Sequence, residues 1–227
     1  MKRVLVGTAV ALALSAVSAL AADMPAKAAY KAPAYLAYNW TGLYLGINGG
    51  GAWGNTTWND PTAGNGSWKT SGGLVGGTVG YNWQAPGSAF VWGVEGDMDF
   101  GKISGSGNNA DCAVLVNCRT RSTWLGTARG RVGYSWDRWL PFITGGAAFG
   151  NIQASSSGTP QESTNRTGWT LGGGAEYAFA GPWSAKLEYL YVDLGSFNCG
   201  TTACGVPSPT SVNHRLNIVR AGVNYRF

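Results

Sequence analysis

Apolar and ionic side chains alternate one by one in successive segments of this chain, and this pattern constrains the fold more than any other feature. In the segment 89–102, five large apolar residues occupy one set of alternate positions, and three carboxylates occupy the other. The apolar set is Phe90, Trp92, Val94, Met98 and Phe100, and the acidic set is Glu95, Asp97 and Asp99. A period of two indicates a β-strand, because successive side chains of a strand point to opposite sides. The pattern predicts strands with one apolar and one ionic face.

About eight segments carry this alternation. They lie near 41–53, 72–84, 89–102, 119–135, 139–152, 166–180, 182–195 and 212–227. Each is long enough for the roughly 9–11 tilted residues with which a strand crosses a bilayer. An even number of strands lets the first pair with the last, which leaves no open edge. We therefore expect an all-β fold, an eight-stranded antiparallel up-and-down barrel.

Composition decides which face of the strands points outward, since alternation alone also fits a soluble sandwich with an apolar interior. Only 12% of the residues are charged, whereas soluble domains carry about a quarter. Tryptophans stand near the strand ends, where the aromatic girdles of membrane barrels lie; these are Trp40, Trp53, Trp83, Trp136, Trp139 and Trp183. We expect a transmembrane barrel whose apolar side chains contact lipid.

The ionic face is expected to line the lumen. Its charged members are Glu95, Asp97, Asp99, Arg121, Arg129, Arg131, Glu176, Lys186, Glu188, Arg220 and Arg226. Acids and bases on adjacent strands predict ion pairs, because a buried unpaired charge costs several kcal/mol. An eight-stranded barrel is just wide enough to be filled by side chains. We expect a lumen closed by an ion-pair network; an ion path or acid–base chemistry is the alternative for the same residues.

The N-terminal segment has the composition of a secretory signal. Met1-Lys2-Arg3 precedes an apolar run that ends in Ala19-Leu20-Ala21, a pattern that signal peptidase cleaves. We predict a signal peptide over 1–21, a flexible periplasmic lead-in over 22–39 and the barrel over 40–227. Without Lys2 and Arg3 the formal charge falls from +5 to +3, so nucleic acid is not an expected partner.

The links between the predicted strands alternate in length. Short links lie at 84–88, 135–138 and 180–182, and long links at 54–71, 103–118, 153–165 and 196–211. Outer-membrane barrels have short periplasmic turns and long surface loops, so the long links are expected at the cell surface. Trp58 and Trp68 fall in the first long link and are candidate contacts for a host or environmental ligand, with solvated loop aromatics as the alternative.

Two further patterns concern assembly and loop chemistry. Val219, Ala221, Val223, Tyr225 and Phe227 alternate with polar residues up to a final aromatic residue, which resembles the signal that the barrel-assembly machinery reads; an ordinary edge strand is the alternative. Cys112 and Cys118, and Cys199 and Cys204, form two close pairs. In an oxidising compartment they favour two local disulfides, although three connectivities are possible, and a zinc site lacks the CxxC spacing it would need.

Nothing in the sequence supports catalysis. His214 is the single histidine, and no serine and acid stand beside it in a pattern that an acyl hydrolase would require. We predict no enzyme activity, no cofactor and no metal.

Several stretches resemble a known family. They are Trp40-Thr-Gly-Leu-Tyr-Leu-Gly, Gly80-Tyr-Asn-Trp-Gln, Gly93-Val-Glu-Gly-Asp, Gly126-Thr-Ala-Arg-Gly-Arg-Val-Gly-Tyr, Lys186-Leu-Glu-Tyr-Leu-Tyr-Val-Asp-Leu-Gly and Val223-Asn-Tyr-Arg-Phe. The chain is similar to the small outer-membrane immunogenic proteins of Gram-negative bacteria, porin-family barrels with the fold of the OmpA membrane domain. The resemblance implies a surface barrel that supports envelope integrity and lies in outer-membrane lipid. Some members bind haemin or form weak pores, so a narrow diffusion channel and a surface ligand binder are the alternative functions.

Overall fold

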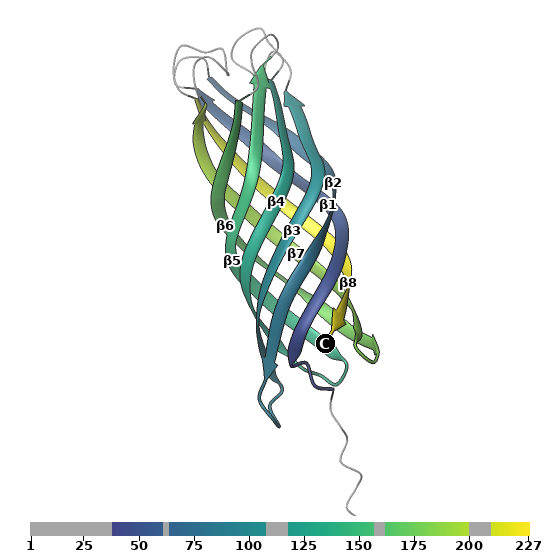
Figure 1. Cartoon of the computed structure of the whole chain (residues 1–227). Helices are drawn as coiled ribbons and strands as arrows, with labels where there is room; N and C mark the ends of the chain where they lie inside the picture. The colour runs from purple at the N-terminus through teal and green to yellow at the C-terminus, as the bar shows by residue number, and fades with distance from the viewer. Residues whose placement is uncertain (1–37, 61–63, 108–117, 157–161, 200–209) are drawn as a thin grey trace, which may run out of the picture. The chain divides into compact units, whose positions relative to one another are not determined.

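Eight β-strands make up the barrel. In a computed structural model of the chain, the structure describes residues 38–60, 64–107, 118–156, 162–199 and 210–227. The strands are β1 (Gly42–Asp60), β2 (Gly64–Gln84), β3 (Phe90–Gly107), β4 (Cys118–Tyr134), β5 (Trp139–Ser156), β6 (Glu162–Ala180), β7 (Trp183–Cys199) and β8 (Thr210–Arg226). Each strand pairs antiparallel with the next and β8 pairs with β1 (Figure 1). The predicted closed eight-stranded meander is confirmed. The described residues include no helix long and apolar enough to cross a membrane.

The strand register staggers strongly around the barrel. Starting at Tyr44 on β1, one can follow the paired residues from strand to strand through β2 to β8. This path returns to β1 at Gly54, so the sheet closes with a stagger of ten residues. A stagger of this size tilts the strands by roughly 40° to the barrel axis, and Figure 1 shows the tilt. Side chains from distant parts of the sequence therefore meet across a narrow lumen.

The two ends of the barrel differ. The lower end carries the links 85–89, 135–138 and 181–182 and the C-terminal residue Phe227 (Figure 1). At the upper end the strands lead into the segments 61–63, 108–117, 157–161 and 200–209, which lie outside the described residues.

The strands extend further toward the upper end than the sequence predicted. β1 continues to Asp60 and β2 starts at Gly64, so the prediction of a long link over 54–71 was wrong. The two strands stay paired residue by residue from Gly54 opposite Thr70 to Asp60 opposite Gly64. These stretches are rich in Asn, Thr, Ser and Gly, so large apolar residues do not recur at every second position along them. The hydrogen-bonded ladder continues although the pattern that predicts it stops.

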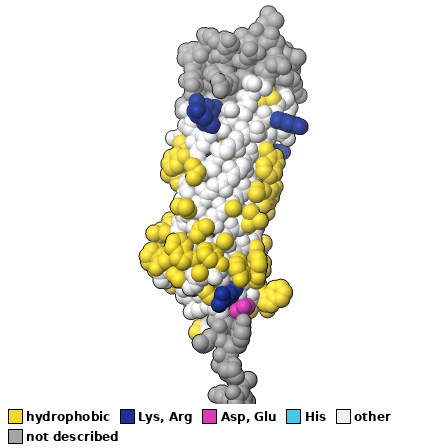
Figure 2. Space-filling view, turned by 90° about the vertical axis from the view of Figure 1, so that its right-hand side faces the viewer, with side chains coloured by type: hydrophobic (Ala, Val, Ile, Leu, Met, Phe, Trp, Pro, Cys, Tyr) yellow, Lys and Arg dark blue, Asp and Glu magenta, His cyan; other side chains and the backbone are white. Residues whose placement is uncertain are grey.

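A band of exposed apolar side chains surrounds the barrel between its ends. It runs from Leu43 to Trp53 on β1, Phe90 to Phe100 on β3 and Trp139 to Phe149 on β5. Each of these stretches is eleven residues long, which matches the length of a tilted strand that crosses a bilayer. Val94, near the middle of the band, is 65% exposed. Figure 2 shows hydrophobic side chains over the lower and middle barrel, with basic side chains above them and basic and acidic side chains at the lower end.

Aromatic residues mark both edges of this band. The lower edge has Trp83, Trp136, Trp139 and Trp183, and the upper edge has Trp53, Phe100, Phe149 and Trp169, all of them exposed. These two edges are called the lower and upper aromatic rims. Two such girdles separated by an apolar band are the outer surface of a membrane barrel.

Trp40 does not belong to the lower aromatic rim, contrary to its predicted place. It is 2% exposed and packs inside the lower end against Val91, Leu140 and Ala178. Its ring lies 4.9 Å from that of Tyr38, centroid to centroid, and the Tyr38 hydroxyl donates a hydrogen bond to the Gly181 carbonyl at 3.0 Å. Burial raises the pKa of Tyr38, which keeps this donor protonated. The chain folds into the mouth of the barrel before β1 begins, so Trp40 closes the mouth instead of facing lipid.

Candidate functional site

Nine charged side chains meet in the lower half of the lumen. This ionic layer consists of Glu95, Asp97 and Asp99 on β3, Arg129 and Arg131 on β4, Glu176 on β6, Lys186 and Glu188 on β7, and Arg220 on β8. None of these side chains is more than 4% exposed. All occupy the inward positions of their strands, opposite to the apolar band. Four cationic groups thus face five carboxylates in a space that water does not reach.

Arg129 joins two walls of the barrel. It contacts Glu95, its partner in register on the neighbouring strand β3. Its Nη2 lies 2.7 Å from Asp97 Oδ2, and its Nη1 lies 2.7 Å from Glu188 Oε1 on β7. Because β4 and β7 are not neighbours in the sheet, the last contact crosses the lumen.

Arg220 approaches the same acids from β8. Its Nη1 lies 2.8 Å from Asp97 Oδ1 and 2.5 Å from Asp99 Oδ2, and its Nη2 lies 2.8 Å from Glu188 Oε2. Asp97 also accepts a hydrogen bond of 2.7 Å from the Thr127 hydroxyl. Arg129 and Arg220 therefore share Asp97 and Glu188, and their four side chains connect β3, β4, β7 and β8.

A second set of contacts extends this network toward the lower end. Lys186 Nζ lies 2.8 Å from Glu95 Oε2, and Arg131 Nη2 lies 2.9 Å from Glu176 Oε2. Glu176 also accepts hydrogen bonds from Ser184 Oγ at 2.5 Å and Asn224 Nδ2 at 2.9 Å. The carboxylates are thus occupied by fixed partners, which is the condition for keeping buried charges in a low-dielectric interior. This arrangement favours a structural network over acid–base chemistry.

Glycine provides the room for the larger side chains. Tyr44 donates a hydrogen bond of 2.7 Å to Glu95 Oε2 and lies against Gly80 on β2. A Cβ atom at Gly80 would collide with the Tyr44 ring and hydroxyl. Small residues beside long ones are what a narrow lumen requires.

Replacing Gly80 with alanine is therefore expected to lower the free energy of unfolding by about 1–3 kcal/mol, the usual cost of overpacking. The measurement is urea unfolding of the barrel in phospholipid vesicles. Gly130→Ala is the matched control, because Gly130 is exposed and a Cβ atom there has no neighbour within 4 Å. Equal stability of the two variants would contradict the tight contact of Tyr44 with Gly80.

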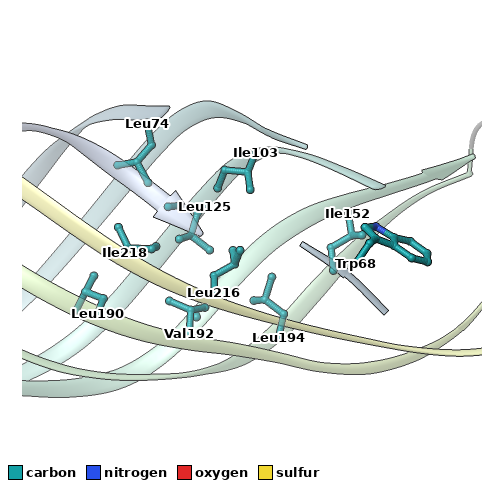
Figure 3. Close-up of a cluster of buried hydrophobic side chains, with 12 residues drawn as sticks. Trp68, Leu74, Ile103, Leu125, Ile152, Leu190, Val192, Leu194, Leu216 and Ile218 are labelled. Carbon is teal, nitrogen blue, oxygen red and sulfur yellow. The ribbon is translucent and has the colours of Figure 1, made fainter. Parts of the chain in front are cut away.

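A cluster of buried apolar side chains lies in the upper half of the lumen, and the sequence analysis missed it. This apolar layer consists of Ala52, Trp68, Leu74, Ile103, Leu125, Ala148, Ile152, Leu190, Val192, Leu194, Leu216 and Ile218, all of them buried. Figure 3 shows labelled members projecting into the interior from several strands. The sequence contains a pattern that could have predicted this cluster. Leu190 lies two positions after Glu188, and Ile218 lies two positions before Arg220, so each apolar residue shares the inward face with its charged neighbour. The inward face changes from ionic to apolar along each of these strands.

Two residues expected in the lumen network lie outside it. Ser122 is buried and inward-facing, so its neighbour Arg121 points outward. Register shifts at Phe100–Ile103 and Ser122–Leu125 mark β-bulges, which change the phase of the alternation. Arg226 is inward-facing but lies over aromatic rings, with its guanidinium carbon 4.4 Å from the Tyr38 ring centroid. Among the described residues, neither arginine forms an ion pair with the nine charged groups.

The ligand contact predicted for Trp68 does not fit the structure, whereas the contact predicted for Trp58 stays a prediction. Trp68 lies in β2, is 6% exposed and belongs to the apolar layer, so its prediction as a surface-loop residue was wrong. Trp58 lies in β1, although its side chain is outside the described part, as is that of His214. Cys112 and Cys204 lie outside the described residues. Cys118 begins β4 and Cys199 ends β7, but neither side chain is described. The predicted disulfides and the signal peptide over 1–21 stay predictions.

The predicted assembly signal lies on the outer wall. Val219, Ala221, Val223, Tyr225 and Phe227 are all exposed, at outward positions of β8 and the residue after it. Tyr225 lies against Trp183 and Phe227, with ring centroids 5.0 Å apart in each pair. The five side chains are part of the surface that faces lipid, and recognition by the assembly machinery stays a prediction.

The apolar band, the two aromatic rims and the closed sheet together define a membrane-spanning β-barrel protein. The sequence matches the family described as outer membrane protein beta-barrel domain over residues 9–227. The chain belongs to this family, and it is a protein of the bacterial outer membrane.

Relatives are similar over almost their full length. The 31 kDa outer-membrane immunogenic protein of Brucella melitensis is 35% identical, with 95% of this chain and 96% of the relative covered. The 22 kDa outer membrane protein of Rhizobium leguminosarum bv. viciae is 34% identical, with 88% and 83% covered. Among solved structures, Neisserial surface protein A has a TM-score of 0.49 at 13% identity, covering 82% of this chain and 98% of that one.

Proposed function

We propose that this protein is a non-conducting surface barrel that supports the outer membrane and presents its upper end to the environment. The observation that carries this proposal is that two successive layers of side chains fill the lumen. The ionic layer cross-links strands on opposite walls, and the apolar layer lies directly above it. A solute would have to break buried ion pairs and then cross an apolar constriction.

A small hollow beside Asp99, where the two layers meet, supports a lumen that is closed along this wall. The hollow is lined by Leu74, Asp99, Ile103 and Leu125, together with neighbouring residues of β3 and β4, and has a volume of about 10 Å³. Such a volume holds about one water molecule at most.

The upper end is proposed to face the outside of the cell. Outer-membrane barrels have short periplasmic turns and longer connections at the surface, and the links of two to five residues lie at the lower end. The Brucella relative is named an immunogenic protein, which supports exposure of one end of the barrel to a host. Surface contact would then involve the upper strand ends and the segments between them.

Pure protein in planar lipid bilayers is expected to show no steady conductance steps at neutral pH, because both layers block the lumen. The measurement is single-channel recording, with a conducting porin inserted into the same membranes as the control. Folding is verified beforehand by the shift in electrophoretic mobility between heated and unheated samples. Reproducible ohmic steps from the folded protein would overturn the proposal in favour of a narrow diffusion channel.

A further inference from the structure

A polar hollow lies on the outer wall of the barrel, away from the lumen. Its volume is about 480 Å³, and side chains from four adjacent strands line it: Asn55 and Thr57 on β1, Ser67 on β2, Tyr191 on β7, and Asn213, Arg215 and Asn217 on β8. The inward neighbours of these positions, such as Thr56 and Leu216, are fully buried. The lining side chains therefore point away from the lumen.

The hollow lies directly above the upper aromatic rim. Asn55 follows the rim residue Trp53 by two positions on β1, and Asn217 is the partner of Trp53 in register on β8. On the other side, Tyr191 packs against the rim residue Trp169, with ring centroids 5.4 Å apart. Aromatic rims lie at the headgroup level of a bilayer. A hollow just above the rim is at the height of lipid headgroups and their sugars.

Two basic side chains flank the centre of the hollow. Asn55 pairs in register with Arg215 on one side and with Lys69 on the other. Three neighbouring strands thus present a cation, an amide and a cation in one row. Adjacent strands are about 4.8 Å apart, so the backbones of the two cations are about 10 Å apart. Their long side chains can contact one phosphate, or two phosphates of one disaccharide headgroup.

Arg215 is held in place but is only partly neutralised. Its Nε lies 3.2 Å from Asp193 Oδ2. The other oxygen of this carboxylate, Asp193 Oδ1, accepts a hydrogen bond of 2.8 Å from the Gly195 backbone N–H. The Arg215 side chain is 63% exposed. Lys102 and Arg121 also face outward above the rim, and among the outward side chains described at this level Asp193 is the only carboxylate. The surface just above the membrane therefore has an excess of positive charge.

We propose that this hollow binds the phosphorylated sugar headgroup of a glycolipid in the outer leaflet. Arg215 and Lys69 would contact phosphate, for which guanidinium and ammonium groups are the usual partners. Asn55, Asn213 and Asn217 supply amides that donate and accept hydrogen bonds, which suits sugar hydroxyls. The apolar band immediately below gives the acyl chains a surface. A free sugar phosphate would use the polar contacts of the hollow alone, whereas a glycolipid would use these contacts and the apolar band below them.

The test measures lipid binding to the full-length barrel in detergent micelles. Native mass spectrometry and quenching of tryptophan fluorescence are used with diphosphorylated lipid A, its monophosphorylated form, phosphatidylglycerol and inorganic phosphate as separate probes. The wild type is expected to bind diphosphorylated lipid A most tightly. The double variant Arg215→Gln with Lys69→Gln is expected to lose about tenfold or more in affinity, because charge-assisted hydrogen bonds to phosphate are removed.

Arg138→Gln provides the matched control, since Arg138 is an exposed base at the lower end of the barrel and its loss is expected to leave binding unchanged. Wild-type affinity in the double variant would overturn the proposal. So would equal binding of phosphatidylglycerol, which indicates unspecific attraction, or binding of inorganic phosphate as tight as that of the lipid. Bilayer conductance tests the closed lumen, and lipid binding tests the hollow on the outer wall. A negative result in one experiment therefore does not decide the other.

Discussion

Replacing Arg220 with alanine is expected to lower the free energy of unfolding by about 3–5 kcal/mol, the cost of removing one partner from a buried ion pair. Arg220 is 1% exposed and contacts Asp97, Asp99 and Glu188 within 2.8 Å. Without it, three carboxylates share the remaining bases in a space that excludes water. The measurement is equilibrium unfolding by urea or guanidinium in phospholipid vesicles, followed by tryptophan fluorescence.

Arg215→Ala is the matched control for this loss. Arg215 lies on the same strand and also pairs with an aspartate, but its side chain is 63% exposed. Exposed ion pairs contribute about 0–1 kcal/mol, so the control is expected to unfold almost like the wild type. Similar losses in the two variants would contradict the difference in burial on which the ionic layer depends.

A second large effect is expected on the lipid-facing wall. Val94→Arg places a charge near the middle of the apolar band on β3, where the side chain is 65% exposed. Arginine at the bilayer midplane of a membrane barrel costs about 2–4 kcal/mol. The free energy of unfolding in vesicles is expected to fall by this amount. In a water-soluble protein, arginine at a position this exposed would be nearly neutral.

Ser106→Arg is the control on the same strand and the same outward face. Ser106 lies beyond the upper aromatic rim, six residues after Phe100. Arginine there is expected to change stability by about 0–1 kcal/mol, as found near membrane interfaces. A cost at position 106 equal to that at position 94 would place the hydrocarbon boundary higher than the aromatic residues indicate.

The barrel could be predicted from the sequence because several membrane-crossing stretches, such as 90–100 on β3, contrast apolar and polar residues at a period of two. Val94 and Asp97 belong to opposite faces in the sequence pattern, and the structure places them on opposite sides of the wall. The upper extensions could not be predicted, because the Asn, Thr and Asp residues at positions 55–60 fit a loop and a polar strand equally well. Arg121 was misplaced because a bulge inserts one residue without changing the composition around it.

Contacts within the lumen depend on information that alternation does not contain. The contact between Glu95 and Arg129 requires only that β3 and β4 are neighbours. The contact between Arg220 and Asp97 joins β8 to β3, and it depends on the stagger with which the sheet closes. That stagger is set by the sum of all eight registers, and a shift of two residues in one of them would keep every side chain on its face while changing its partners.

The length of the strands has a consequence for the proposed surface role. β1 continues seven residues past Trp53 and β3 seven residues past Phe100, which at about 2.5 Å of height per tilted residue amounts to roughly 18 Å. With the upper end facing outward as proposed, the ends of β1 and β3 would stand above the innermost sugars of the leaflet. A protein that binds these strand ends would then not have to displace lipid.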